Sequence, residues 1–423
     1  MTQDTAFELV SSTVRYGIGV TQEVGMDLAD LGARRVLVVT DPHVSRLKPA
    51  HSVRASLERN GVMCVVYDRV GIEPTDVSWQ DAIAFARTSA FDALVAVGGG
   101  STIDTAKAIN LYTSYPPRDF RDYVNPPVGK GLAVPGPLKP LIAVPTTAGT
   151  GSETTGVAVF DDSSLHAKTG ISSRRLKPTL ALLDPENTRT VPPGVAACAG
   201  LDILCHAVES YTAVPFTSRP RPDRPALRPA YQGANPISDV WSIQSLRMLT
   251  SYFLRAVADS TDEEARGQML LAATYAGIGF GTAGVHLPHA MSYPVSGRVR
   301  DFTAPGYDAD RPLVPHGLSV ILNAAAAFRF TAPANPVRHL EAAEALGANV
   351  AGARLDNAGS LLADRITWFT QQVHVPTRLS AIGYTTADIP ALVEGTLLQQ
   401  RLTKLSPRQV SAGDLERIFE DAL

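Results

Sequence analysis

Three histidines and one aspartate have the residue types and settings expected of metal ligands: Asp202, His206, His289 and His316. Asp202 and His206 stand four residues apart in a segment with helical spacing, which places both side chains on one face, one turn apart. The other two histidines lie in apolar segments of their own. Neutral imidazoles and a carboxylate suit Fe(II), Zn, Mn or Co alike, and burying any of them without a partner is costly. Each residue alone could be a core side chain satisfied by a backbone carbonyl, but the combination favours a divalent metal site.

Two glycine-rich turns have the composition of a nucleotide-binding crevice. The turn at 98–101, Gly-Gly-Gly-Ser, stands where an expected strand passes into a helix, and glycines there let the backbone approach a phosphate. The loop at 146–153 follows the next strand and is rich in hydroxyls and glycines. Asp41 ends the first strand, where its carboxylate could bond ribose hydroxyls and favour NAD over NADP. A simple tight turn at 98–101 and a simple turn at Asp41 stay open as alternatives.

The first half of the chain alternates apolar, β-rich runs with helical patterns. We expect strands over 34–41, 63–68, 93–101 and 138–147, and helices over 53–61, 79–91 and 102–114. This alternation predicts an α/β domain with a doubly wound parallel sheet. The strands are apolar throughout rather than alternating, which agrees with a sheet covered on both faces.

From about residue 192 the composition changes, and the chain consists mainly of Ala- and Leu-rich segments with helical periodicity. A chain of 423 residues is too long for one ordinary core. We therefore predict a dinucleotide-binding α/β domain over 1–191 and an all-α, metal- and substrate-binding domain over 192–423. Two segments crowded with Pro, Gly and Arg interrupt the helices, at 218–236 and 296–312, and loops of this length are often functional.

The composition argues against several classes of partner. A net charge of -3 gives no basic footprint for nucleic acid, and no apolar run approaches the roughly 20 residues of a membrane span. The N-terminal residues show neither a secretory signal nor an Arg-rich import segment, and three cysteines cannot build a disulfide framework. We therefore expect a cytoplasmic protein that binds neither nucleic acid nor membrane.

Together these residues resemble the iron-type, metal-dependent alcohol dehydrogenase family. The matching motifs are GGGSTIDTAK at 98–107, PTTAGTGSE at 145–153, the D-x-x-x-H at 202–206, HAMSYP at 289–294 and PHG at 315–317. The resemblance implies NAD(H) and a divalent metal, Fe(II) first and Zn as an alternative, held by the four residues named above. It also implies a set of residues around the cofactor: Asp41, Gly98, Gly99, Gly100, Ser101, Asp104, Thr146, Thr147, Thr150 and Lys168.

Within that family the chain most resembles the group of hydroxyacid-oxoacid transhydrogenases, over passages such as RYGIGVTQEVGMDL and RPAYQGANPISD. The resemblance implies oxidation of 4-hydroxybutyrate to succinate semialdehyde, coupled to reduction of 2-oxoglutarate to 2-hydroxyglutarate through a nicotinamide that stays bound. One metal acting as a Lewis acid would serve both half-reactions. The partners would be small carboxylates, and we expect a homo-oligomer, a dimer.

Two residues are candidates for catalysis, Tyr293 and Lys168. Alcohol dehydrogenases of this family usually carry a second histidine four residues after the third ligand, where this chain has Tyr293. A tyrosine can donate a hydrogen bond but is a poorer base at neutral pH. His286, three residues before His289, could substitute for the missing histidine, and a purely structural His286 is the alternative.

Carboxylate substrates call for a cationic clamp, and arginine suits bidentate binding of a carboxylate. The candidates lie in the two interrupting loops: Arg219, Arg221, Arg224, Arg228, Arg298, Arg300 and Arg311. Such loop arginines could instead serve solubility or a subunit contact.

Three other functions are compatible with parts of this pattern. A conventional NAD-dependent alcohol dehydrogenase or maleylacetate-type reductase, with exchangeable cofactor, would use the same residues. A lyase of the dehydroquinate synthase type would share the two-domain plan, but its phosphate-binding basic cluster is not evident. A binding protein with a vestigial site is the last, and the intact ligands and glycine turns argue against it.

Overall fold

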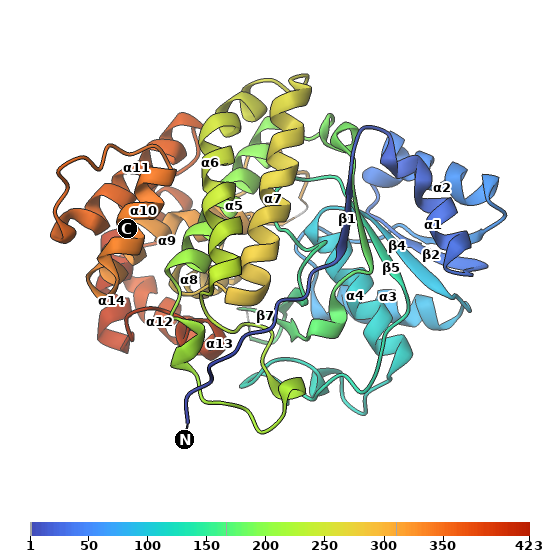
Figure 1. Cartoon of the computed structure of the whole chain (residues 1–423), viewed down its shortest axis with the longest axis horizontal. Coiled ribbons are helices and arrows are strands. Elements are labelled where there is room, and N and C mark those ends of the chain that lie inside the picture. The colour runs from blue at the N-terminus through green and yellow to red at the C-terminus, as the bar shows by residue number, and fades with distance from the viewer. Residues whose placement is uncertain (1, 166, 310) are drawn as a thin grey trace.

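The computed structural model describes residues 2–165, 167–309 and 311–423. Its elements form two regions side by side (Figure 1). One region is a parallel sheet with helices on both faces, and the other is built from helices. The predicted fold class, an α/β region followed by a helical one, is therefore confirmed.

The main sheet has six parallel strands in the order β1-β8-β5-β4-β2-β3. These are β1 (Thr13–Tyr16), β2 (Arg35–Val39), β3 (Met63–Tyr67), β4 (Ala93–Gly98), β5 (Leu141–Pro145) and β8 (Leu180–Leu183). Every residue of β4 and β5 is buried, as in central strands covered on both faces. The chain runs from β2 outward to β3 and then returns across β2 to β4. The strand order thus reverses between β2 and β4, where open α/β sheets bind ligands.

Helices cover the two faces of this sheet in pairs. On one face lie α1 (Val24–Asp30) and α2 (Lys48–Arg59), and on the other α3 (Asp76–Arg87) and α4 (Gly100–Ser114). Consecutive residues of β2 alternate between the two cores: Val36 and Val38 pack in the first, Leu37 and Val39 in the second. After the exposed Arg35, the strand is apolar because both of its faces are covered.

A separate antiparallel hairpin, β6 (Val157–Asp162) and β7 (Ala167–Ser172), stands beside the main sheet. The backbone N–H of Asp161 donates to the carbonyl of Pro74 at 2.8 Å, which ties the hairpin to the segment before α3. The sequence patterns predicted neither this hairpin nor the short strands β1 and β8. The four strands and three helices that they did predict are present, with shifted ends.

The second region holds ten helices among the described residues. They are α5 (Pro193–Thr212), α6 (Pro236–Ala258), α7 (Glu263–Ala283), α8 (Leu287–Gly297), α9 (His316–Thr331), α10 (Pro336–Ala345), α11 (Ala358–Gln372), α12 (Ile389–Leu397), α13 (Gln400–Thr403) and α14 (Ala412–Ala422). Helices α5, α6 and α7 pack together (Figure 1). Gly200 allows the close approach of α5 and α6, because a Cβ there would lie 2.1 Å from the ring of Phe253.

The predicted division at 191/192 falls between β8, which ends at Leu183, and α5, which begins at Pro193. That the two regions are separate domains stays a prediction. Among the described residues, no single helix is long and apolar enough to cross a membrane. Helices α7 and α8 meet that test on length and composition only as a pair, bent by 104°.

Candidate metal and cofactor site

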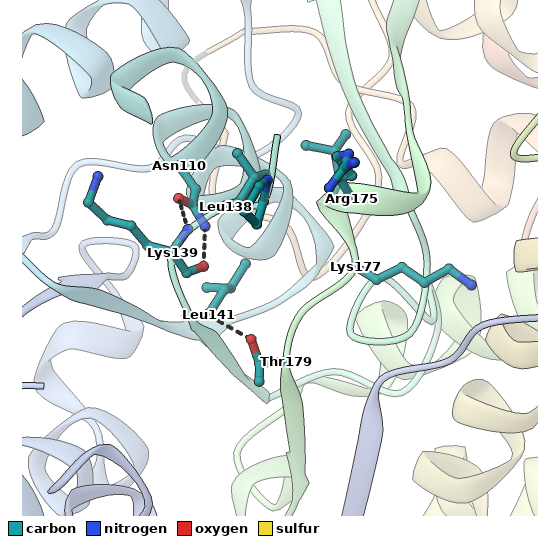
Figure 2. A pocket seen from close by; sticks show the side chains of 9 residues that line it. Asn110, Leu138, Lys139, Leu141, Arg175, Lys177 and Thr179 are labelled. Atoms are coloured by element: carbon teal, nitrogen blue, oxygen red, sulfur yellow. Dashed lines mark hydrogen bonds between the residues drawn. The ribbon is translucent and has the colours of Figure 1, made fainter. Parts of the chain in front are cut away.

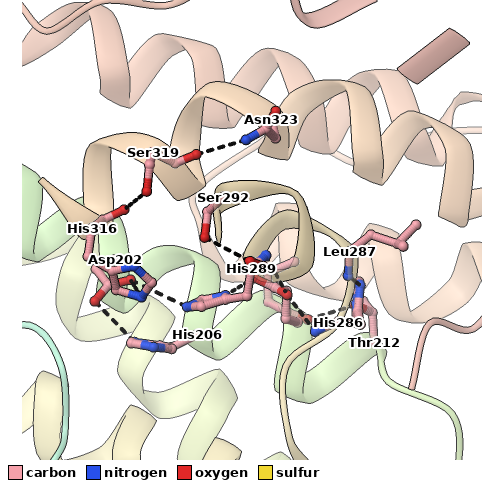
Figure 3. Close-up of polar contacts among 12 residues, drawn as sticks. Asp202, His206, Thr212, His286, Leu287, His289, Ser292, His316, Ser319 and Asn323 are labelled. Carbon is pink, nitrogen blue, oxygen red and sulfur yellow. Dashed lines mark hydrogen bonds and ion pairs between the residues drawn. The ribbon is translucent and has the colours of Figure 1, made fainter. Parts of the chain in front are cut away.

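The four predicted metal ligands come together at the junction of three helices (Figure 3). Asp202 and His206 lie on α5, His289 on α8, and His316 is the first residue of α9. One potential ligand atom from each residue lies within 4.8 Å of the others. The Nε2 atom of His289 is 3.5 Å from Oδ1 of Asp202, and Nδ1 of His206 is 3.8 Å from Oδ2 of Asp202. Residues separated by more than a hundred positions in sequence thus converge on one point.

A glycine lets α9 approach α5 closely enough to complete this cluster. Gly317, directly after His316, packs against α5, where a Cβ would lie 2.0 Å from the carbonyl oxygen of Cys198. The same Cβ would lie 3.0 Å from the Cβ of Asp202. A larger residue at this position would push the start of α9, and with it His316, away from the other three side chains.

The donor atoms of the cluster fit a divalent cation. One atom of each residue is buried and has no hydrogen-bond partner among the described residues: Asp202 Oδ1, His206 Nδ1, His289 Nε2 and His316 Nδ1. Buried polar atoms are normally paired, so four orphaned acceptors around one point require an explanation. One carboxylate and three imidazoles are a donor set that Fe(II) or Zn accepts.

The charges of the cluster shift the pKa values of its members. Burial alone would raise the pKa of Asp202, but His206 and His316 hold it below its usual value. Burial lowers the pKa of His206 to about 3, which favours the neutral imidazole that a metal needs. For His289, burial lowers the pKa, but the charges of Glu209 and Asp202 outweigh it and raise the pKa to about 9.

Glu209 is a residue that the sequence reasoning missed. It lies on α5 with no exposed surface, and its Oε1 accepts a hydrogen bond from Nδ1 of His289. Its Oε2 accepts from the backbone N–H of His286 at 2.6 Å. With Nδ1 holding the proton, Nε2 of His289 is left to face Asp202, the arrangement typical of metal-binding histidines. The spacing was the available signal, because Glu209 is three residues after His206 and seven after Asp202.

A second carboxylate, Glu73, supports His316 from the other region. Its Oε1 accepts the backbone N–H of His316 at 3.0 Å, and its Oε2 pairs with the ammonium of Lys168. Glu73 has a φ of 52°, a left-handed conformation that is uncommon outside glycine. Lys168 is buried on β7 and also pairs with Asp161 at 3.1 Å. The two carboxylates raise the pKa of Lys168 against the effect of burial, so it stays charged.

Most of the predicted cofactor residues lie at the carboxyl ends of three neighbouring strands, whereas Asp104 lies on α4 and Lys168 on β7. Asp41 follows β2, the glycine turn ends β4, and Thr146 follows β5. The backbone N–H of Thr146 donates to the carbonyl of Gly98 at 3.0 Å, which holds the two turns together. Helix α4 begins at Gly100, with no side-chain cap and no acidic residue in its first turn. Its free N–H groups and dipole therefore favour an anion such as a phosphate.

The glycines of this turn are required by close contacts with the second loop. A Cβ on Gly100 would lie 2.6 Å from Cγ2 of Thr150, and one on Gly99 would lie 3.2 Å from Oγ1 of Thr147. In the middle of the same loop, a Cβ on Gly149 would lie 2.8 Å from that of Ala199, one turn before Asp202 on α5. The loop thus connects the predicted phosphate site to the helix that carries two of the predicted metal ligands.

Two of the predicted cofactor residues, Asp41 and Asp104, also have structural partners. Oδ1 of Asp41 accepts from the backbone N–H groups of His43 and Val44, at 2.9 and 2.8 Å, so the turn interpretation holds alongside the cofactor one. Ser101 is half-buried in the first turn of α4. Both oxygens of Asp104 are engaged, one with Ser152 and one with the backbone of Val159. We therefore expect Asp104 to hold the loop rather than touch a ligand.

The structure also places the two residues considered for the missing histidine. The hydroxyl of Tyr293 accepts from Nη2 of Arg401 at 2.8 Å, and its ring centroid lies 6.3 Å from that of His316. His286 is fully buried, and its Nδ1 accepts from the backbone N–H of Leu287, while Nε2 pairs with Thr212. Both nitrogens of His286 are thus used within the protein, which favours the structural role.

The loop arginines proposed as a carboxylate clamp are mostly committed elsewhere. Arg219 and Arg228 both pair with Asp4, and Arg300 pairs with Asp388. Of the remaining candidates, Arg221 and Arg224 are exposed, whereas Arg298 is half-buried. Arg311 is exposed, pairs with Asp161 at 3.8 Å and donates to the carbonyl of Glu73 at 3.0 Å, whose side chain contacts His316. Four of the seven candidates therefore already have a carboxylate partner: Arg219, Arg228, Arg300 and Arg311.

A cavity of about 260 Å³ lies away from this site, near the starts of β5 and β8 (Figure 2). It is lined in part by the basic residues Lys139, Arg175 and Lys177. The side chains of Lys139 and Lys177 point to opposite sides (Figure 2). The ammonium of Lys177 donates to the backbone carbonyl of Val10. Because the cations do not converge on one point, this cavity is not a candidate active site.

The comparisons with known proteins agree with the geometry. Residues 11–185 match the family described as iron-containing alcohol dehydrogenase, and residues 230–423 match the C-terminal part of the Fe-containing alcohol dehydrogenase family. The chain belongs to the iron-containing alcohol dehydrogenase family and is an oxidoreductase. Membership supports, in general terms, a divalent metal and a nicotinamide cofactor.

Two relatives share more than half of their residues with this chain. It is 57% identical over 419 residues to the mitochondrial hydroxyacid-oxoacid transhydrogenase of Xenopus tropicalis, covering 99% of this chain and 90% of the relative. It is 56% identical over 423 residues to the protein of the same name from Homo sapiens, covering 100% and 91%.

Two solved structures have the same fold over nearly all of both chains. A 1,3-propanediol oxidoreductase has a TM-score of 0.85 at 26% identity, covering 99% of this chain and 100% of its own. The alcohol dehydrogenase of Oenococcus oeni has a TM-score of 0.85 at 28% identity, with the same coverage.

The prediction of a cytoplasmic protein is wrong by these comparisons, because the relatives are named as mitochondrial. One ground for that prediction was the small number of cysteines. All three are free in the structure. That condition does not by itself single out the cytoplasm.

Proposed function

We propose that this protein is a hydroxyacid-oxoacid transhydrogenase that oxidises 4-hydroxybutyrate and reduces 2-oxoglutarate. The observation that carries the proposal is a group of four buried side-chain atoms that could bind a metal and have no hydrogen-bond partner among the described residues. They lie next to a turn suited to a dinucleotide. The relatives at 56–57% identity carry that name over the full length of this chain. Asp202, His206, His289 and His316 are the proposed ligands of Fe(II), with Zn as the alternative.

Each half-reaction moves one hydride and one proton, in opposite directions for the two substrates. When bound, a divalent metal polarises the substrate oxygen, and a nicotinamide takes up and returns the hydride. The protein's own groups bind and orient the reactants. The turn at 98–101 and Thr146, Thr147 and Thr150 would hold the dinucleotide, and Asp41 its ribose. Asp104 would fix the loop.

Tyr293 and Lys168 are the residues proposed to take part in catalysis. The hydroxyl of Tyr293 accepts a hydrogen bond from Arg401, so its own proton is free to be donated to a substrate oxygen. Lys168 is fixed by two carboxylates and keeps its charge, so it can stabilise negative charge but is a poor proton donor. We propose an orienting and electrostatic role for Lys168.

The test uses purified protein loaded with Fe(II), both substrates, and no added nicotinamide. Equal amounts of succinate semialdehyde and 2-hydroxyglutarate are expected, because one hydride lost from the first substrate reaches the second. The second candidate, a dehydrogenase with exchangeable cofactor, has the same site residues. It would form product only after NAD is supplied, and NADH would then accumulate. That outcome would refute the transhydrogenase.

We also propose that the chain assembles with itself, as a dimer. Strand β1 lies at the edge of the sheet and, among the described residues, pairs with β8 alone. It carries the exposed apolar side chains Val14 and Tyr16, with Ile18 just beyond. Exposed apolar residues on an open edge strand are typical of pairing surfaces. The dimer is tested by size-exclusion chromatography with light scattering on the eluted protein. A monomeric mass at micromolar concentration would contradict it.

A further inference from the structure

Arg401 is a cation for which the described residues supply no carboxylate. It lies on α13, where Nη2 donates to the hydroxyl of Tyr293 and the guanidinium carbon lies 5.6 Å from the ring centre of Tyr231. The other terminal nitrogen, Nη1, is buried and has no hydrogen-bond partner among the described residues. Arg401 forms none of the ion pairs found there. An unpaired cation below the surface is costly, so an anion that binds beside it would be strongly favoured.

Arg401 stands one side chain away from the proposed metal ligands. Tyr293, which it contacts, is four residues after His289 on α8 and therefore on the same face, one turn on. The ring centre of Tyr293 lies 6.3 Å from the ring centre of His316. It lies 6.0 Å from the guanidinium carbon of Arg401. Tyr293 thus lies between the metal ligands and the unpaired cation.

Tyr293 packs among other aromatic and aliphatic side chains in this region. Tyr231, Phe280, Tyr293 and Leu402 belong to one buried cluster. Phe280 also stacks on the imidazole of His206, with ring centres 4.0 Å apart. A ligand reaching from the metal ligands to Arg401 would therefore meet a charge at each end and apolar surface in between.

The two proposed substrates share a chemical feature that matches this arrangement. In 4-hydroxybutyrate the reacting carbon is followed by two methylenes and a carboxylate. In 2-oxoglutarate the reacting carbon is likewise followed by two methylenes and the distal carboxylate. The oxidised and reduced products keep the same unit. One cation at a fixed distance from the metal would therefore serve both half-reactions in one pocket.

We propose that Arg401 binds the carboxylate that both substrates carry two methylenes from the reacting carbon, and so determines substrate specificity. The inference rests on the function proposed above. The proposed clamp lies on α13 and not in the two arginine-rich loops. In those loops, Arg219, Arg228 and Arg300 already pair with aspartates. The segment is well anchored, because Nε2 of Gln399 donates to the backbone carbonyl of Lys168 at 3.2 Å. The clamp is thereby tied to the strand that carries Lys168.

The test compares substrates with and without the distal carboxylate, the one two methylenes from the reacting carbon, in Arg401→Met and Arg401→Lys. The substrate pairs are 4-hydroxybutyrate against butan-1-ol, and 2-oxoglutarate against 2-oxopentanoate, assayed with the metal-loaded enzyme. Losing one partner of a buried charge pair costs about 2–4 kcal/mol, so Arg401→Met should lower kcat/KM for the carboxylates roughly 30- to 1,000-fold. For butan-1-ol and 2-oxopentanoate, which lack the distal carboxylate, kcat/KM should fall by a much smaller factor, since they lose only the effect of the hydrogen bond from Arg401 to Tyr293.

Controls separate this role from general damage. Lys404→Met removes an exposed cation three residues on and should leave all four kcat/KM values near those of the wild type. Arg401→Lys keeps the positive charge but not the planar guanidinium that can donate two hydrogen bonds to one carboxylate. A smaller loss of kcat/KM is therefore expected, confined to 4-hydroxybutyrate and 2-oxoglutarate. Equal losses on all four substrates, or no loss with the carboxylates, would overturn the clamp. If the wild type itself does not turn over 4-hydroxybutyrate, the proposed function fails instead.

Discussion

Replacing Glu209 by glutamine tests whether the buried carboxylate on α5 prepares His289 for a metal. In the native arrangement Oε1 of Glu209 receives the Nδ1 proton of His289, and Oε2 receives the backbone N–H groups of His286 and His289, at 2.6 and 3.4 Å. Glutamine has one oxygen and one NH₂ in place of two oxygens. Whichever way the amide turns, a donor faces a donor.

If the oxygen keeps the backbone contacts, the NH₂ faces Nδ1 of His289, and the imidazole proton has to move to Nε2. That tautomer cannot offer Nε2 to a metal. If the amide turns over, two buried N–H groups lose their acceptor. A lost hydrogen bond to a charged group costs about 1.5–3 kcal/mol, and lost outer-shell partners weaken metal binding about 10- to 100-fold. We expect a loss of metal affinity in that range.

The assay is competition for Zn²⁺ between metal-free protein and a chromophoric chelator, with circular dichroism as the check on folding. Glu153→Gln is the matched control, because Glu153 is also buried but bonds Thr274 on α7, at 2.8 Å, and no proposed ligand. Its metal affinity should stay within about twofold. Wild-type affinity in folded Glu209→Gln would refute the reasoning, as would an equal loss in both variants.

Further predictions concern the cofactor turn, the metal ligands and a surface ion pair. Gly100→Ala forces a Cβ to within 2.6 Å of Thr150 Cγ2, and overpacking by about 1–3 kcal/mol should weaken NADH binding roughly 5- to 150-fold, measured by calorimetry; unchanged affinity would contradict the contact. Asp202→Ala should abolish retention of metal after dialysis, measured by elemental analysis, and a full complement of metal would exclude Asp202 as a ligand. Arg300 lowers the pKa of Asp388 to about 2, so the pair stabilises the fold above about pH 4 and less as the pH falls toward 2. Asp388→Asn should therefore lower the free energy of unfolding by up to about 1 kcal/mol at pH 7 and less at pH 3, and a pH-independent difference in urea unfolding would count against the pair.

The parts of the fold with strong local patterns could be predicted from sequence. Strand β4 is apolar throughout and ends in three glycines, and α5 carries Asp202 and His206 on one face, so both are visible in a single window. The hairpin β6–β7 and the strand β1 are short and interrupted by polar residues. Their position depends on partners distant in sequence, such as Pro74 for the hairpin, and no local pattern shows that contact.

The same distinction applies to the site. The four proposed ligands could be found from residue type and spacing, but Glu209, Glu73 and Arg401 acquire their significance only from distant contacts. Glu73 meets His316 across 243 positions, and Arg401 meets Tyr293 across 108. Conversely, the arginine-rich loops suggested a clamp because they are conspicuous in sequence. The structure shows Arg219 and Arg228 paired with an aspartate near the N-terminus, which sequence proximity could not reveal.

The most direct test of the central claim follows the hydride itself. The Fe(II)-loaded protein is given 4-hydroxybutyrate with deuterium at C4, unlabelled 2-oxoglutarate and no free nicotinamide, and the 2-hydroxyglutarate is analysed by mass spectrometry. One deuterium at C2 of each product molecule is predicted, because the hydride passes from one substrate to the other within one site. Unlabelled 2-hydroxyglutarate, or no product until NAD is added, would contradict transhydrogenation at this site.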